Sequence, residues 1–128
     1  MSQISIAQLF EDKREKLKLS WVSGSEGSNK LLTGDSVLNT DKEAIGYLNF
    51  IQPDWIQVLN SDGINYLNRL DTHTLEKKTN QLIQSNMVCI IIADNAEAPK
   101  SILALSNNAN IPLLSSPYPS SEIIWVIR

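Results

Sequence analysis

Hydrophobic residues near the start of the chain recur at the spacing of an amphipathic helix. Ile6 and Phe10 share one face of a helix expected over residues 5–16. Ser5 and Gln8 stand three residues apart at its start, the spacing of a capping box in which each side chain binds a free backbone N–H. The chain is therefore expected to open with a capped helix whose apolar face packs against a core.

Short apolar runs bounded by turn residues follow, and they favour strands in this part of the chain. Residues 60–63 read Asn-Ser-Asp-Gly, which is typical of a turn, and residues 23–30 are rich in Gly and Ser, which favours a loop. The pattern leaves the structure of residues 31–45 undecided. The expected strands cover 19–22, part of 45–51 and 56–59.

The second half of the chain alternates between strand patterns and helix patterns. Residues 87–93 form a continuous apolar run, which is typical of a strand buried on both faces inside a parallel sheet. The elements around it are two short helices within 64–83, a helix from Pro99 to about Asn108, a strand at 111–114 and a last helix at 120–128. Such alternation predicts an α/β fold with a mostly parallel sheet covered by helices.

Length and composition agree with one domain and exclude several functional classes. The chain has 128 residues, of which 42% are apolar and 20% charged, and its formal net charge is −3. That length suits one domain with a real core, and the acidic balance argues against a nucleic-acid surface, which needs clustered Lys and Arg. A single cysteine, the lack of a signal peptide and the lack of an apolar run near the roughly 20 residues of a membrane span favour a cytoplasmic protein without membrane contact.

Polar residues follow three of the expected strands and form the first candidate site. Asn60, Asp94 and Ser115 each stand at or after the end of a strand pattern. Ligands of open α/β sheets bind at the carboxyl ends of the strands, so these residues could share one rim, although strands also end in polar residues for structural reasons. Trp55 lies directly before 56–59 and is a candidate contact for a partner, with packing against the core as the alternative.

Three further features could carry chemistry, but each is better explained without it: residues 24–31 as a surface loop, Cys89 as a buried side chain and His73 as a surface or capping residue. The segment 24–31 resembles a phosphate-binding loop, but Asn29 replaces the second glycine and Leu31 replaces the hydroxyl residue that would bind Mg²⁺. Cys89 lies inside the long apolar run, where a buried small side chain is expected and a thiolate is not. Because His73 is the only histidine, no zinc constellation is available, and we expect no catalytic residue, metal ligand or cofactor in this chain.

Three segments together resemble one known family. The first reads ISIAQLFED at 4–12, followed by a Lys-rich helix and LSWV. The second reads GYLNFIQPDWIQVL at 46–59. The third contains CIIIAD at 89–94 and IPLLSSPYPS at 111–120. In this order the segments resemble the N-terminal domain of bacterial HPr kinase/phosphorylase, the HPr serine kinase.

The resemblance implies a two-part protein of which this chain is the first part. The family's N-terminal domain is similar to a three-layer α/β/α sandwich, with a mostly parallel or mixed sheet, that a cell-wall ligase shares. Its C-terminal domain carries the phosphate loop, uses ATP and Mg²⁺, phosphorylates and dephosphorylates a serine of a phosphocarrier protein, and drives assembly of a hexamer. Residues 1–128 are thus expected to be one non-catalytic domain excised from that protein, with a regulatory or partner-contact role.

The chain departs from the family pattern at two places. Asn60 stands where members usually carry Gly, a mild change because Asn tolerates left-handed backbone. Residues 39–42 read Asn-Thr-Asp-Lys where many members have an Arg-Pro pair.

Two other functions are alternatives to a domain of this family. One is a stand-alone sensor that binds a small ligand at the rim of Asn60, Asp94 and Ser115, and the other is an enzyme with an unfamiliar site.

Overall fold

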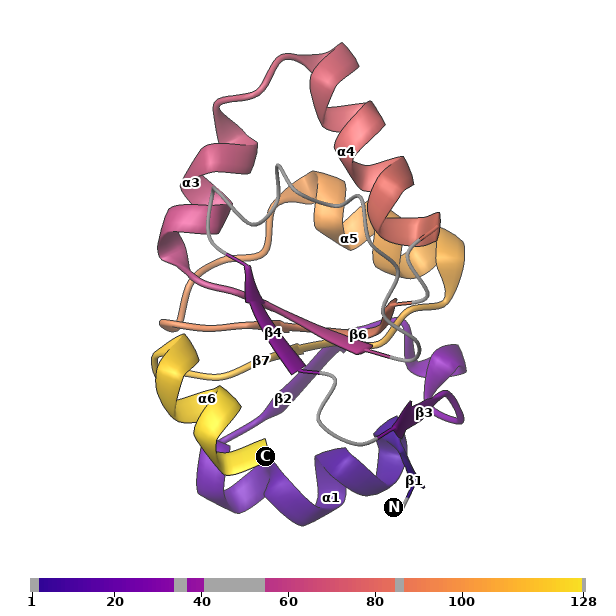
Figure 1. The fold of residues 1–128 in the computed structure, drawn as a ribbon, viewed down its shortest axis with the longest axis vertical. Helices are drawn as coiled ribbons and strands as arrows, with labels where there is room; N and C mark the ends of the chain where they lie inside the picture. The colour runs from indigo at the N-terminus through magenta and orange to yellow at the C-terminus, as the bar shows by residue number, and fades with distance from the viewer. Residues whose placement is uncertain (1–2, 34–36, 41–54, 85–86, 128) are drawn as a thin grey trace.

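A five-stranded sheet forms the middle of the molecule in the computed structural model, which describes residues 3–33, 37–40, 55–84 and 87–127 (Figure 1). Across the sheet the strands are β2 (Ser20–Ser23), β7 (Leu113–Ser115), β6 (Met87–Ile92), β5 (Trp55–Leu59) and β4 (Val37–Thr40). The pairs β4–β5, β5–β6 and β6–β7 are parallel, and the edge strand β2 is antiparallel to β7. The sheet is mixed, but most of its strand pairs are parallel, and this confirms the expectation of a mostly parallel sheet.

Helices cover both faces of this sheet. The elements α1 (Ile6–Leu17) and α6 (Ser120–Ile127) lie on one face, and α3 (Ser61–Asn68), α4 (Thr72–Gln84) and α5 (Lys100–Ala109) lie on the other (Figure 1). A separate antiparallel pair joins β1 (Gln3–Ser5) to β3 (Leu31–Thr33), and a 3₁₀ turn, η1 (Ser25–Gly27), lies between β2 and β3. The three-layer α/β/α sandwich is therefore confirmed. No described helix is long and apolar enough to cross a membrane.

The strand β6 connects the two halves of the core. All six of its residues are buried, which confirms the expected central strand. Ile91 packs in the cluster beneath α1 and α6, whereas Ile90 and Ile92 pack in the cluster beneath α3, α4 and α5. Because successive side chains of a strand point to opposite faces, only a continuous apolar run can serve both clusters.

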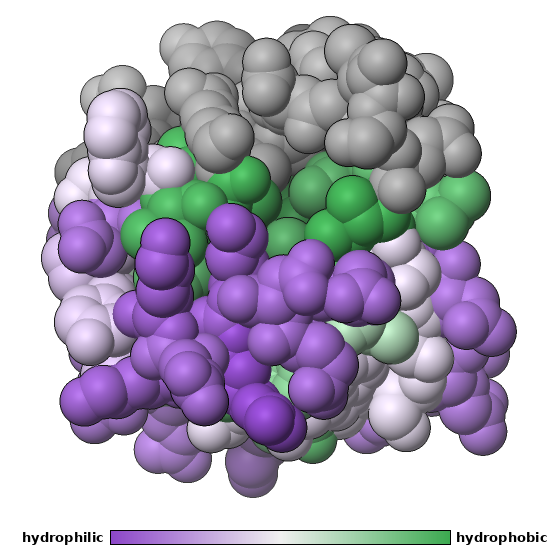
Figure 2. Space-filling view, turned by 90° about the horizontal axis from the view of Figure 1, so that it is seen from below, coloured by the Kyte–Doolittle hydropathy of each residue, from purple (hydrophilic) through white to green (hydrophobic). Residues whose placement is uncertain are grey.

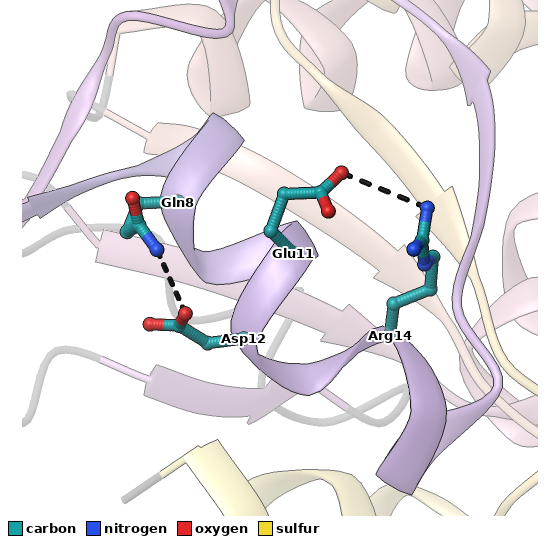
Figure 3. A network of polar contacts seen from close by, with 4 residues as sticks. All are labelled: Gln8, Glu11, Asp12 and Arg14. Atoms are coloured by element: carbon teal, nitrogen blue, oxygen red, sulfur yellow. Dashed lines mark hydrogen bonds and ion pairs between the residues drawn. The ribbon is translucent and has the colours of Figure 1, made fainter.

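The first helix begins where its sequence signal predicts. Ser5 is the N-cap of α1, and its Oγ accepts a hydrogen bond from the Gln8 N–H at 3.1 Å. The Gln8 side chain does not complete the capping box: its Nε2 donates to Asp12 Oδ1 at 2.7 Å (Figure 3). Glu11 and Arg14 form an exposed ion pair at 3.7 Å on the same helix (Figure 3), which adds little stability in water.

The region after β5 differs from its expected structure. Residues 60–63 do not form a free turn, because Asn60 is the N-cap of α3 and its Oδ1 accepts from the Gly63 N–H at 2.8 Å. The break within 64–83 is confirmed: the carboxylate of Asp71 accepts from the Thr74 N–H at 2.7 Å at the start of α4. That hydrogen bond holds the pKa of Asp71 below its usual range.

The structure assigns part of residues 31–45, the segment that the sequence pattern leaves undecided. Residues 31–33 and 37–40 form the strands β3 and β4. The strand expected within 45–51 lies outside the described residues. The expected loop at 23–30 contains η1, and the helices after Pro99 and at the end of the chain agree with their predicted positions within one or two residues.

Candidate functional site

The three rim residues lie at one edge of the sheet, as the strand order predicts. In the ladder Leu59 pairs with Ile92, and Ile92 pairs with Ser115, so β5, β6 and β7 end at the same level. Asn60 and Asp94 follow directly after this level, and Ser115 is the last residue of β7. The sequence therefore correctly grouped Asn60, Asp94 and Ser115 along the carboxyl edge.

Two of these three residues serve as helix caps. Asp94 Oδ2 accepts hydrogen bonds from both the backbone N–H and the Oγ of Ser61, each at 2.9 Å, at the first turn of α3. Asn60 caps the same helix from within its own loop. A carboxylate is favourable there because the helix N-terminus exposes unpaired N–H groups and partial positive charge. The carboxylate of Asp94 therefore joins the β6–α5 connection to α3.

The same connection is tied to the segment that leads into α6. Asp94 and Asn95 both have left-handed backbone, with φ of 62° and 54°. Their N–H groups donate to Tyr118 O at 2.9 Å and to Ser116 O at 3.1 Å. The left-handed turn directs both N–H donors at the β7–α6 segment, so backbone hydrogen bonds join these two segments of the rim.

Ser116 is a residue of this rim that the sequence did not single out. Its side chain is 1% exposed, and its Oγ donates to the carbonyl of Leu17 at 2.7 Å and accepts from the Tyr118 N–H at 3.2 Å. A serine between a strand and a proline-rich segment gives no sequence signal for such a contact. Its effect is to join the end of α1 to the rim.

We expect Asp94→Ala to lower the free energy of unfolding by about 2 kcal/mol. It removes the acceptor for two hydrogen bonds and places alanine at a left-handed position. Chemical denaturation of the chain measures this loss. Asp94→Asn is the matched control, because it keeps one acceptor oxygen and tolerates positive φ; it should lose less than about 1 kcal/mol. Equal losses in both variants would contradict the capping role.

Trp55 does not share this rim. It is the first residue of β5, whereas Asn60 follows the last residue of the same strand, so the two lie at opposite edges of the sheet. A contact made through Trp55 would therefore be separate from a ligand held at Asn60, Asp94 and Ser115.

The glycine-rich loop is a packing element. Gly24 has φ of 71°, and a Cβ at this position would lie 2.6 Å from both the carbonyl carbon of Ile111 and Ser106 Oγ. A Cβ at Gly27 would lie 2.7 Å from Pro112 Cδ. The two glycines allow η1 to lie directly against the α5–β7 connection. Close packing therefore accounts for glycine at both positions, and no bound phosphate is needed to explain them.

Cys89 is buried and His73 lies at the surface, as their positions in the sequence favour. Cys89 is fully buried in β6, and burial raises the pKa of its thiol because the charged thiolate loses its hydration. His73 is exposed in the first turn of α4. Within the described part of the chain, no three His, Cys, Asp or Glu side chains are grouped so as to bind a metal ion.

Among the residues that the structure describes, the most exposed large apolar side chain is one that the sequence did not indicate as a site. Trp125 on α6 is 78% exposed, whereas Leu31, Val22 and Ile83 are 42–43% exposed. Residues 123–127 read Ile-Ile-Trp-Val-Ile, which is apolar all round the helix. A helix at the surface turns only one side toward the core, so a helix that is apolar on every side exposes some of its apolar residues. The apolar run at 123–127 was therefore the sequence signal that could have indicated an exposed apolar residue here.

Comparisons with known proteins give the family. The chain matches the family described as HPr Serine kinase N terminus over residues 4–128. The HPr kinase/phosphorylase of Nitrosomonas europaea is 46% identical over 128 residues, and that of Chromobacterium violaceum is 30% identical over 128 residues. Each alignment covers all of this chain and 40% of the relative, so the chain spans less than half the length of these proteins.

A solved structure supports the fold independently. The CBS and DRTGG domains of the regulatory region of a Clostridium perfringens pyrophosphatase, complexed with the activator diadenosine tetraphosphate, match with a TM-score of 0.60. The match covers 95% of this chain and 48% of that one at 17% identity, which is evidence for a shared fold alone. With the family match extending over residues 4–128, the chain belongs to the family of HPr serine kinase N-terminal domains.

Proposed function

We propose that this chain is the non-catalytic regulatory or partner-contact domain of an HPr serine kinase/phosphorylase. The observation that carries the proposal is the family match over residues 4–128 combined with coverage of only 40% of each relative. In this proposal the remainder of the protein binds ATP and Mg²⁺ and transfers phosphate to and from a serine of an HPr-like phosphocarrier protein. That remainder would also drive hexamer assembly, and the whole protein would act in the cytoplasm.

The chemistry of the described residues supports a non-catalytic role. Phosphoryl transfer requires a cradle of backbone N–H groups and ligands for the metal ion. Gly24 and Gly27, which could have supplied such a cradle, pack against residues 110–112. The rim carboxylate of Asp94 is held by Ser61. In this proposal, phosphoryl transfer belongs to the part of the protein outside this chain.

The test compares the full-length protein, expressed from the source gene, with residues 1–128 alone. Each is incubated with ATP, Mg²⁺ and the phosphocarrier protein, and phosphoserine is measured by mass spectrometry. We expect phosphorylation by the full-length protein only. Phosphate transfer by the isolated chain would overturn the non-catalytic assignment, and an inactive full-length protein would overturn the kinase assignment. A version lacking residues 1–128 should keep transferring phosphate but respond differently to effectors, and an unchanged response would remove the regulatory role.

A second candidate is a small-ligand sensor at the rim of Asn60, Asp94 and Ser115. The observation that favours it is the shared fold with a regulatory region crystallised with diadenosine tetraphosphate. Binding to the folded state alone raises stability by about 2.7 kcal/mol at a ligand concentration of 100 Kd. Diadenosine tetraphosphate is the first compound to try, and a rise in melting temperature that Ser115→Ala abolishes would favour the sensor. An unchanged melting temperature would count against this ligand at this rim.

A further inference from the structure

The outer face of α6 carries one exposed tryptophan, Trp125, which is not part of the core. Ile123 is fully buried against the cluster beneath α1 and α6, and Trp125, two residues later, points away from it. Two helical steps of about 100° each turn a side chain by roughly half a circle, which explains the exposure of the indole. Ser121 and Glu122 are exposed on the same helix.

The other apolar residues of α6 turn toward the core. Ile124, Val126 and Ile127 are partly buried and pack against the core cluster. Figure 2 shows green, apolar atoms beside the polar surface of the face that carries α1, and α6 lies on the same side of the sheet in Figure 1. An exposed tryptophan beside apolar surface is typical of an interface anchor.

We propose that the face of α6 formed by Ser121, Glu122 and Trp125 docks against the part of the same polypeptide that lies beyond residue 128. This inference rests on the proposed function, because it requires the longer protein. The curated relatives supply that length, since this chain spans 40% of each. Because α6 and the remaining polypeptide belong to one chain, their surfaces meet at a high effective concentration. A small contact area is therefore enough to hold them together.

The small size of the exposed patch argues for a tethered partner over a second copy of this chain. A tryptophan side chain buries about 150–250 Å², whereas a stable interface between separate molecules needs about 1,000 Å² or more. The other apolar residues of α6 already pack against the core. The chemistry of the occupant follows from the face: an apolar pocket for the indole, and a Lys or Arg placed to meet the carboxylate of Glu122, one turn before Trp125.

The test measures how accessible Trp125 is in the isolated chain and in the full-length protein. Acrylamide quenching of fluorescence is recorded for the natural sequence and for Trp125→Phe, and their difference isolates the signal of Trp125. We expect ready quenching in the isolated chain and severalfold weaker quenching in the full-length protein. Equal quenching in both would overturn the proposal, and protection that grows with the concentration of the isolated chain would assign the face to a second copy.

Limited proteolysis gives a second readout. Trp125→Ala should speed cleavage between residues 1–128 and the remainder of the full-length protein, because the docked arrangement opens. Ile83→Ala is the matched control: Ile83 is an exposed apolar residue of α4, on the other face of the sheet, and its loss should leave cleavage unchanged. The kinase assay is independent of these results. An active kinase with an accessible Trp125 would refute the docking alone, whereas an inactive protein would refute the proposed function.

Discussion

Gly24→Ala is expected to lower the free energy of unfolding by about 4 kcal/mol. A left-handed position costs an alanine about 1–2 kcal/mol, and forcing a methyl group into a filled space costs about 1–3 kcal/mol more. Both penalties apply here, because φ is 71° and the added Cβ would overlap the backbone of Ile111 and approach Ser106 Oγ. Neither obstacle is the free end of a flexible side chain, since Ser106 Oγ is itself held by a hydrogen bond to Ile111 O at 2.6 Å.

Thermal unfolding followed by circular dichroism measures this effect. For a domain of this size a loss of about 4 kcal/mol lowers the melting temperature by roughly 15 °C. Ser25→Ala, in the same turn, is the control: its side chain is exposed, and its loss should change stability by less than about 0.5 kcal/mol. A Gly24→Ala variant as stable as this control would show that the loop is not packed against the α5–β7 connection.

The loop shows what the sequence could predict and what it could not. The Gly and Ser content of residues 23–30 predicted irregular backbone, because these residues favour turns. The reason for each glycine depends on residues 110–112, more than eighty positions later in the chain. A local sequence pattern cannot show that residues so far apart in the chain are in contact. The same holds for Ser116, whose partner Leu17 is 99 positions away.

Elements set by local signals were predicted well. The N-cap at Ser5 and the buried strand at 87–92 depend on neighbouring residues or on a continuous apolar run, and both are present. The antiparallel direction of β2 was not predicted, because strand direction depends on the connections of the whole sheet. At 60–63 turn residues and cap residues are the same types, so the sequence favoured a turn where a helix begins.

The candidate rim illustrates the same limit at the level of function. Strand order placed Asn60 and Asp94 at one edge correctly. Whether their polar atoms face a ligand or the protein depends on hydrogen bonds between separate loops, such as the pair from Ser61 to Asp94. Those contacts give Asp94 a role in the stability of the fold.

Ser116→Ala is the second substitution with a large expected effect, a loss of about 3 kcal/mol in the free energy of unfolding. The hydroxyl donates to the buried Leu17 carbonyl at the end of α1 and accepts from the part-buried Tyr118 N–H, and alanine removes both hydrogen bonds. An unpaired buried polar group costs about 1–3 kcal/mol, and the last carbonyls of a helix have no partner within the helix.

Urea denaturation of Ser116→Ala measures this loss, and Ser115→Ala is its matched control. Ser115 is one residue earlier and half-buried, and removing its hydroxyl should cost less than about 1 kcal/mol. The order of the two losses is the informative result. If Ser115→Ala were the more damaging variant, the rim would depend on the strand end and not on the contact between Ser116 and α1. If Ser116→Ala is the more damaging one, the hydroxyl of Ser116 joins the α1 end of the domain to the segment that leads into α6, and it thereby helps to hold the helix that presents Trp125.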